Sequence, residues 1–201
     1  MCFTPYAIFE SDEEGEYRTE TYLSSTKKLE KEKRCIGAII MLNPGSSEPK
    51  EKGKDGQLTD AKPDNTMKQI EKCVVKAYGD KKPKEGYIQI FNLFNLRNQK
   101  SGKAVKIYNN KTSPYMESPI EIKEGTPWVW LAWGCRSSKK LECRKKNVYT
   151  MIERQVPESK IIKLGFKKNS PLSFKHPKPQ LKKQQDEIID EIAPQISKLI
   201  I

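Results

Sequence analysis

The stretch that decides the fold is residues 36–47, which read IGAIIMLNPGSS. A short apolar run that ends in a turn signal is typical of a buried strand in a parallel sheet. Asn43 stands where this strand ends, Pro44 fixes φ and removes a hydrogen-bond donor, and Gly45 permits backbone angles that other residues resist. Open α/β sheets bind ligands beyond the carboxyl ends of their strands. Asn43 is therefore a candidate site residue, and the alternative is a plain turn after a core strand.

The composition indicates a protein that binds a polyanion. Lysine and arginine number 38 against 26 aspartates and glutamates, so the net charge is +12 and the isoelectric point is near 9.4. Such an excess favours DNA or another nucleic acid as the partner over a basic surface that serves solubility alone. The 201 residues are enough for one domain with a sizeable core. We predict a single domain over residues 1–201, a monomer without an obligate protein partner.

Membrane, secretion and metal signals are absent from the sequence. No apolar run approaches the ~18 residues that a membrane span needs. Residues 1–20 lack the basic start and apolar run of a secretory signal, so we expect a cytoplasmic protein without a membrane partner. The five cysteines include no C-x-x-C pair and the chain has one histidine. We therefore expect reduced thiols, no metal site and no cofactor.

Strand and helix patterns alternate along the chain, which predicts a three-layer α/β/α sandwich around a mostly parallel, four-stranded sheet. Residues 1–34 predict an N-terminal hairpin and then a charged approach to the first core strand. The core strands are predicted at residues 36–42, 86–96, 126–134 and 159–165. The helices are predicted at residues 64–79, 136–155 and 181–201. The polar residues 46–62 and 97–125 are predicted to be loops. Pro194 is expected to kink or interrupt the closing helix.

The end of the second predicted strand also carries a polar side chain. Asn92 follows the run YIQIF, and its amide offers a donor and an acceptor side by side, as reading a base edge requires. The flanking rings of Phe91 and Phe94 are candidates for stacking on a flat heterocycle. In the alternative interpretation both rings belong to the core and the asparagine caps a loop.

Further candidates lie at two helix starts and in a late loop. Arg136 and Lys139 open the helix after the third strand, a place where a phosphate is readily bound. Asp64 is expected to cap the first helix, or alternatively to point into the site and contact the base. His176, the single histidine, lies in the proline-stiffened basic segment 174–181, FKHPKPQL. This setting favours a functional role over a structural one.

Four short motifs occur in an order that resembles the uracil-DNA glycosylase superfamily: LNPG, FNL, LAWG and HPKP. The mismatch-specific branch of that superfamily has a comparable Asn-Pro-Gly at the end of its first strand. The uracil-specific branch has a Leu-Leu-Trp-Gly strand and a His-Pro-Ser-Pro loop. The middle of the chain is also similar to DUF1643, a bacterial family of unknown function. The resemblance covers residues 36–181.

This resemblance implies a uracil-DNA glycosylase-like fold and a DNA glycosylase that flips a base out of DNA and hydrolyses its N-glycosidic bond. Asn43 would position the water that attacks the sugar C1′. Asn92 would face the extruded base, with Phe94 or Phe91 stacked on it. His176 would stabilise the negative charge on the departing base.

The same resemblance implies a set of contacts to the DNA around the flipped nucleotide. Leu181 or Gln180 would fill the gap left in the duplex. The residues expected to hold phosphates are Ser46, Ser47, Lys175 and Lys178, in addition to Arg136 and Lys139.

Two departures from the uracil-specific branch change the expected chemistry. Asn43 replaces an aspartate, and because an amide cannot act as a general base, positioning and electrostatics would have to carry the reaction. Gly45 and Ser46 stand where a tyrosine normally excludes larger bases. They leave room beyond the pyrimidine 5-position, which favours a modified pyrimidine such as the hypermodified cytosine of phage DNA, and a role in phage defence. Two alternatives stay open: a non-catalytic nucleic-acid-binding module of the same fold, and a hydrolase of free nucleosides or nucleotides.

Overall fold

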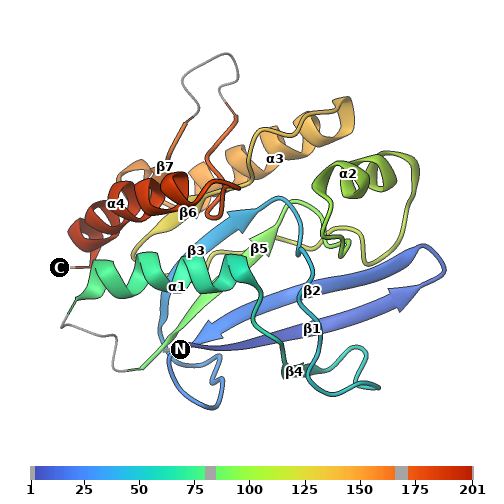
Figure 1. The fold of residues 1–201 in the computed structure, drawn as a ribbon, viewed down its shortest axis with the longest axis horizontal. Helices are drawn as coiled ribbons and strands as arrows, with labels where there is room; N and C mark the ends of the chain where they lie inside the picture. Colours follow the sequence, from blue (N-terminus) through green and yellow to red (C-terminus); the bar gives the residue numbers. More distant parts are fainter. Residues whose placement is uncertain (1–2, 80–84, 166–171, 201) are drawn as a thin grey trace.

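The computed structural model describes residues 3–79, 85–165 and 172–200. Within them lies a seven-stranded sheet with the order β4-β1-β2-β5-β3-β6-β7 (Figure 1). The strands are β1 (Thr4–Asp12), β2 (Gly15–Ser24), β3 (Cys35–Met41), β4 (Leu58–Asp60), β5 (Tyr87–Asn92), β6 (Val129–Leu131) and β7 (Ile161–Lys163). The four predicted core strands correspond to β3, β5, β6 and β7. They pair in parallel, β3 with both β5 and β6, and β6 with β7.

The predicted four-stranded, mostly parallel sheet is wrong in size, because the N-terminal hairpin joins it. β1 and β2 pair antiparallel as predicted, and β2 also pairs antiparallel with β5. β4 pairs with the outer edge of β1 and lies within residues 46–62, which the sequence predicts as a loop. The hairpin thereby covers an edge of β5 whose backbone donors and acceptors would otherwise stay open to solvent or to another chain. The sheet is therefore mixed.

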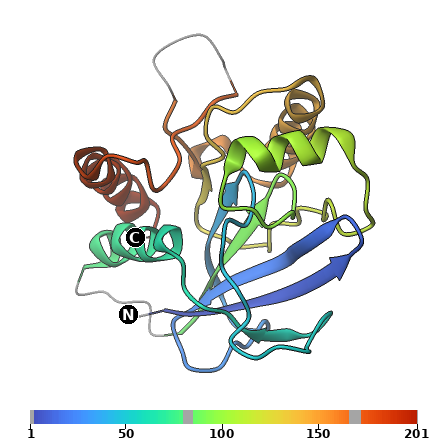
Figure 2. The ribbon, with the colours of Figure 1, turned by 45° about the vertical axis from the view of Figure 1, so that its right-hand side comes forward.

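Helices cover both faces of the sheet, as predicted (Figures 1 and 2). They are α1 (Asn65–Tyr78), α2 (Ser101–Asn110), α3 (Lys139–Gln155) and α4 (Lys182–Leu199), with a short 3-10 helix, η1 (Glu158–Lys160), before β7. α1 and α4 lie side by side on one face, and α2 and α3 pack on the other. β3 is covered from both sides, since Ile39 and Met41 pack with α1 and α4, while Ile40 packs with α2 and α3. This double burial explains the unbroken apolar run of the strand.

Two helices differ from the prediction. α2 lies inside residues 97–125, predicted as a loop. It buries only Ala104, Val105 and Tyr108, and no side chain caps its start, so its apolar pattern is too weak to be identified from the sequence. α4 continues through Pro194, so the proline does not interrupt the helix.

Gly37 determines how closely the chain before β6 approaches β3. A Cβ at residue 37 would lie 2.0 Å from Cζ2 of Trp128. Trp128 is fully buried and packs in the cluster that contains α1 and α4. Only glycine lets the indole pass this close to the backbone, so the register of β6 beside β3 depends on it.

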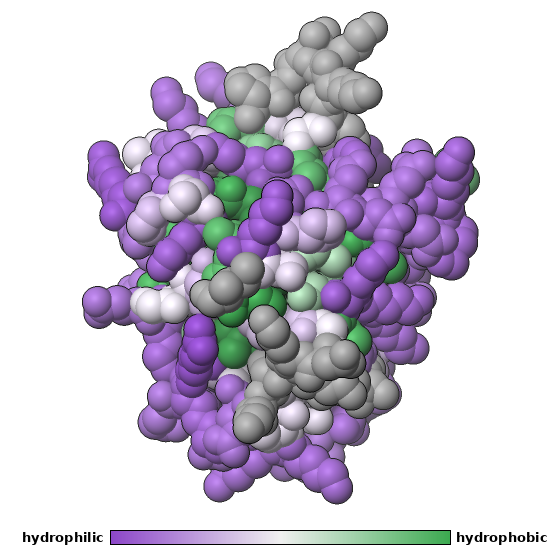
Figure 3. Space-filling model, turned by 90° about the vertical axis from the view of Figure 1, so that its left-hand side faces the viewer, coloured by the Kyte–Doolittle hydropathy of each residue, from purple (hydrophilic) through white to green (hydrophobic). Residues whose placement is uncertain are grey.

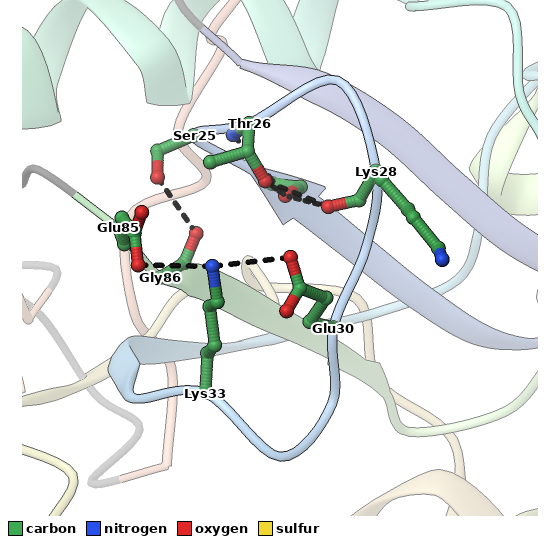
Figure 4. Close-up of polar contacts among 8 residues, drawn as sticks. Ser25, Thr26, Lys28, Glu30, Lys33, Glu85 and Gly86 are labelled. Atoms are coloured by element: carbon green, nitrogen blue, oxygen red, sulfur yellow. Dashed lines mark hydrogen bonds and ion pairs between the residues drawn. The ribbon is translucent and has the colours of Figure 1, made fainter.

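The charged segment before β3 forms its own ion pairs at the amino ends of β3 and β5 (Figure 4). Lys33 Nζ lies 3.1 Å from Glu30 Oε1 and 2.9 Å from Glu85 Oε2. The backbone N and the hydroxyl of Ser25 each donate to Gly86 O at 2.9 Å. These contacts hold the predicted charged approach against the start of β5. Because the acidic partners are exposed, we expect the ion pairs to contribute little to stability.

The surface is mainly hydrophilic where α1 and α4 end. Figure 3 shows this side of the molecule, with apolar residues confined to a narrow strip between hydrophilic ones. Among the described residues there is no helix with the length and apolar character needed to cross a membrane.

Candidate active site

A cavity of about 710 Å³ lies where β3 and β6 end. Its wall comes from the turn after β3, the start of α1, the turn after β6 and the segment before α4. Neighbouring parallel strands end at the same edge of a sheet, which is why segments far apart in the sequence meet here. The volume is in the range of pockets that hold a small ligand or a nucleobase. Asn43, Asp64 and His176, all predicted from the sequence, line this one cavity.

The side-chain amide nitrogen of Asn43 is held by two backbone carbonyl oxygens. Its Nδ2 donates to Leu96 O at 3.3 Å and to Asn98 O at 3.0 Å. These bonds use both amide hydrogens and identify which side-chain atom is the nitrogen. Oδ1 accepts no hydrogen bond from the described residues, so Asn43 presents an acceptor to a ligand. An aspartate here would face two carbonyl oxygens, which is a physical reason for an amide at this position.

Asp64 caps α1, as one of the two alternatives predicts, and it also lines the cavity. Its Oδ1 accepts from Thr66 N at 2.9 Å and from Met67 N at 2.8 Å. Gly45, at φ +71°, brings the turn after β3 close to the other oxygen: a Cβ at residue 45 would lie 3.4 Å from Asp64 Oδ2. Within the described chain, Oδ2 makes no hydrogen bond. A carboxylate oxygen therefore remains available beside the turn that carries Asn43.

His176 is held as a neutral imidazole. Burial lowers its pKa below the ordinary 6.5, while a hydrogen bond to the Lys178 backbone and the Asp64 carboxylate partly oppose this effect. Nδ1 lies 3.1 Å from Lys178 N and 3.2 Å from Lys178 O. We assign Nδ1 as the acceptor of the Lys178 N–H, because a proton there would leave that fixed donor without a partner. The ring proton is then on Nε2, which makes no hydrogen bond to any described residue and can donate to a ligand.

The predicted basic residues differ in their relation to the cavity. Arg136 and Lys178 line it. Lys175 also lines it, but its Nζ lies 2.8 Å from both carboxylate oxygens of Glu191, so its charge is already paired. Lys139 is exposed in the first turn of α3, outside the cavity wall.

Of the DNA contacts predicted next to the Asn-Pro-Gly turn and before α4, some line the cavity and others do not. Ser46 is exposed and lines the cavity. Ser47 is buried and donates its hydroxyl to Lys62 O at 2.9 Å, which makes it part of the loop structure. Gln180 lines the cavity, and the adjacent Leu181 has 63% of its surface exposed.

Three predicted base contacts lie outside the cavity wall. Asn92 is buried at the end of β5. Phe94 is fully buried and stacked on Tyr108, with ring centroids 4.5 Å apart, and Phe91 packs against the same core cluster. In the described chain, the segment that follows β5 reaches the cavity wall through Asn98, Gln99 and Ser101, further along than these three residues. For Phe94, the core role weighed as an alternative is the one the structure has.

The part of the wall that follows β6 is not predicted from the sequence. Trp133, Gly134 and Cys135 line the cavity. Trp133 is fully buried, with Nε1 donating to Leu172 O at 2.7 Å. The signal that identifies these residues is the end of a third parallel strand, which lies at the same edge as the end of β3.

The fold and the site define an α/β protein with a cavity at the carboxyl edge of its parallel strands, lined by an amide, a carboxylate and a neutral imidazole. Residues 22–178 match the model of DUF1643, a protein family of unknown function, so the chain belongs to that family. No curated protein and no solved structure matches the chain.

Proposed function

We propose that this protein is a monofunctional DNA glycosylase that flips a modified pyrimidine out of DNA and hydrolyses its N-glycosidic bond. The observation that carries the proposal is that Asn43 and His176 line one cavity, the first with Oδ1 left as an acceptor and the second with the ring proton assigned to Nε2. In the proposed reaction Asn43 accepts a hydrogen bond from the attacking water and aims it at C1′. His176 donates to the departing base and stabilises its developing negative charge. The product is an abasic site.

Kinship with the uracil-DNA glycosylase superfamily is part of the same proposal. Three of the motifs that carry the resemblance contribute to one cavity: Asn43-Pro44-Gly45 after β3, Trp133-Gly134 after β6, and His176 with Pro179 before α4. Their convergence supports the roles that the resemblance implies for Asn43 and His176.

The proposed substrate follows from the small residues of the wall. Gly45 and Ser46 line the cavity and leave space where a larger side chain would contact the 5-position of a pyrimidine. This favours a bulky base such as the hypermodified cytosine of phage DNA, and a role in defence against phage. Faster release of plain uracil than of glucosylated hydroxymethylcytosine would contradict the enlarged pocket.

The proposed DNA contacts use the exposed residues around the cavity. Flipping a base costs a few kcal/mol, which contacts to the DNA backbone have to offset. Arg136 and Lys178 line the cavity, and in this proposal they bind phosphates of the DNA backbone. Leu181 is exposed beside the cavity residue Gln180, and in this proposal it fills the gap in the duplex.

The test is to incubate the protein with duplexes that carry uracil, mismatched thymine or glucosylated hydroxymethylcytosine and to assay for alkali-labile abasic sites. We expect strand scission at the modified base, and its loss when Asn43 and His176 are both changed to alanine. Salt-sensitive DNA binding without base release would instead identify a non-catalytic module. Release from free nucleosides but not from DNA would identify a nucleoside hydrolase.

A further inference from the structure

Arg18 is a buried cation without a hydrogen-bond partner. It lies in β2 and is fully buried, and Nε, Nη1 and Nη2 make no hydrogen bond to any of the described residues. Burying a guanidinium is costly unless an anion compensates it. Burial lowers the pKa of Arg18 to about 10, and the carboxylate of Asp64 opposes this shift. Arg18 is therefore charged at neutral pH, and the carboxylate of Asp64 favours this charge electrostatically.

The backbone of Arg18 is tied to the loop that holds the turn after β3. Its backbone N donates to Asn95 O at 3.0 Å. In the same loop, Arg97 Nε donates to Ser47 O at 2.9 Å, two residues after the Asn-Pro-Gly turn. The charge of Arg97 disfavours the charge of Arg18, and the charge of Asp64 favours it. Arg18 thus interacts electrostatically with the cation that holds the turn and with the anion at the start of α1.

Asp64 has a carboxylate that can accept a proton, which the amide of Asn43 cannot do. The two backbone bonds to Oδ1 fix the carboxylate at the start of α1. Oδ2 stays available next to Gly45, and Asp64 shares the cavity wall with Asn43 and His176. We propose that Asp64 is the catalytic base of this site and that Arg18 is the positioning residue behind it. The inference rests on the proposed function.

In the proposed step, a water molecule that donates a hydrogen bond to Asn43 Oδ1 attacks C1′, and the other proton of this water moves to Asp64 Oδ2. The new bond is C1′–O, and the bond that breaks is the glycosidic C1′–N bond. The electron pair of the broken bond leaves with the base, whose charge the Nε2–H of His176 stabilises. Asp64 then returns the proton to solvent. Hydrolysis needs no oxidant, reductant or second substrate.

The chain offers a variant that separates catalysis from folding. Asparagine caps helices about as well as aspartate, so Asp64→Asn keeps the start of α1 and removes the carboxylate. We expect its single-turnover release of the best base among the three duplexes to fall about 100-fold or more, the usual contribution of a general base. Its urea midpoint and its affinity for a duplex with a non-cleavable 2′-fluoro nucleotide should stay within about threefold. Asp60→Asn, at an exposed carboxylate paired with Lys50, is the matched control and should keep the wild-type rate.

The outcomes distinguish this inference from the function on which it rests. Release by Asp64→Asn within threefold of the wild type overturns the role of Asp64 and leaves the glycosylase intact. If the wild type releases no base from any duplex, the proposed function fails and the base role fails with it. Release by the wild type together with a large loss in Asp64→Asn, but not in Asp60→Asn, supports both.

Arg18 is tested by removing its charge and restoring it. Arg18→Met removes a cation that interacts electrostatically with Asp64, so we expect the single-turnover rate to fall while the affinity for the 2′-fluoro duplex stays within about threefold. Arg18→Lys restores the charge and should restore the rate. A wild-type rate in Arg18→Met, in a variant whose urea midpoint is close to that of the wild type, overturns the positioning role.

Discussion

At the scale of single residues, the amide at position 43 is tied to the backbone around it. Asn43 Nδ2 donates to Leu96 O and Asn98 O, so the side chain is a structural donor as well as a proposed acceptor for water. We predict that Asn43→Asp lowers the free energy of unfolding by about 1–3 kcal/mol, because it sets a carboxylate against two carbonyl oxygens. Asn43→Ala loses the same bonds without the repulsion and should be less destabilised. Urea unfolding of both variants measures this, and an Asn43→Asp variant as stable as the wild type would contradict it.

His176 gives the protein a pH dependence that can be assigned to one residue. Its folded pKa lies below 6.5, so as pH falls through 6.5 the unfolded chain takes up a proton that the folded protein refuses. Stability is therefore fully present above this pH and decreases below it. Since the chain has one histidine, His176→Asn should reduce the difference between urea midpoints at pH 7.5 and pH 5.5. Equal pH differences in the two proteins would show that the imidazole is not held neutral.

Residues with a local signal could be predicted, and those placed by distant pairing could not. Asn43 follows an apolar run, Asp64 precedes a helix, and His176 lies between prolines, so each has its signal in the adjacent sequence. Arg18 sits in an alternating strand where an arginine is expected to face solvent. In the fold it pairs with Phe9 next to the register shift between β1 and β2, and it is fully buried. A register shift and the burial beside it cannot be predicted from the adjacent sequence.

At the scale of secondary-structure elements, β3 and the approach to β6 depend on Gly37. An added methyl group would meet the Trp128 ring at 2.0 Å, and neither the buried indole nor the central strand has room to move. We predict that Gly37→Ala lowers the free energy of unfolding by about 1–3 kcal/mol or more. Gly165→Ala is the control, since a Cβ there meets no atom of the described residues within 4 Å and φ is not in the left-handed region. Similar urea midpoints for the two variants would contradict the packing of Trp128 on β3.

The elements that the sequence predicts are those with a strong periodic or apolar pattern. β3 is buried on both faces, and α1 has a cap, an apolar face and a glycine end, so both were identified. α2 and β4 have weak patterns, because α2 buries few residues and β4 contributes three residues to an edge. The size of the sheet was underestimated for a related reason. The alternation of polar and apolar residues predicts a hairpin, but it does not indicate which strand of the sheet the hairpin pairs with.

At the scale of the whole molecule, the net charge of +12 predicts salt-dependent binding to DNA. Arg136 and Lys178 line the cavity, so each should contribute about one phosphate contact. Arg136→Ala and Lys178→Ala should each lower the slope of log K against log salt concentration by about 1. Lys28→Ala is the matched control, because this exposed lysine lies in the loop before β3, whereas the cavity lies after β3. Its side chain points away from the contacts of Figure 4. Equal slopes in all three variants would show that DNA does not bind at the cavity.

The central claim is that the cavity lined by Asn43, Asp64 and His176 releases a base from DNA. The most direct measurement is mass spectrometry of a duplex with one glucosylated hydroxymethylcytosine after incubation with the wild type and with a variant that carries Asn43→Ala and His176→Ala. We expect free modified base and abasic strand in equal amounts from the wild type, and neither from the variant. An intact duplex in both reactions, or equal release by the variant, would contradict the claim.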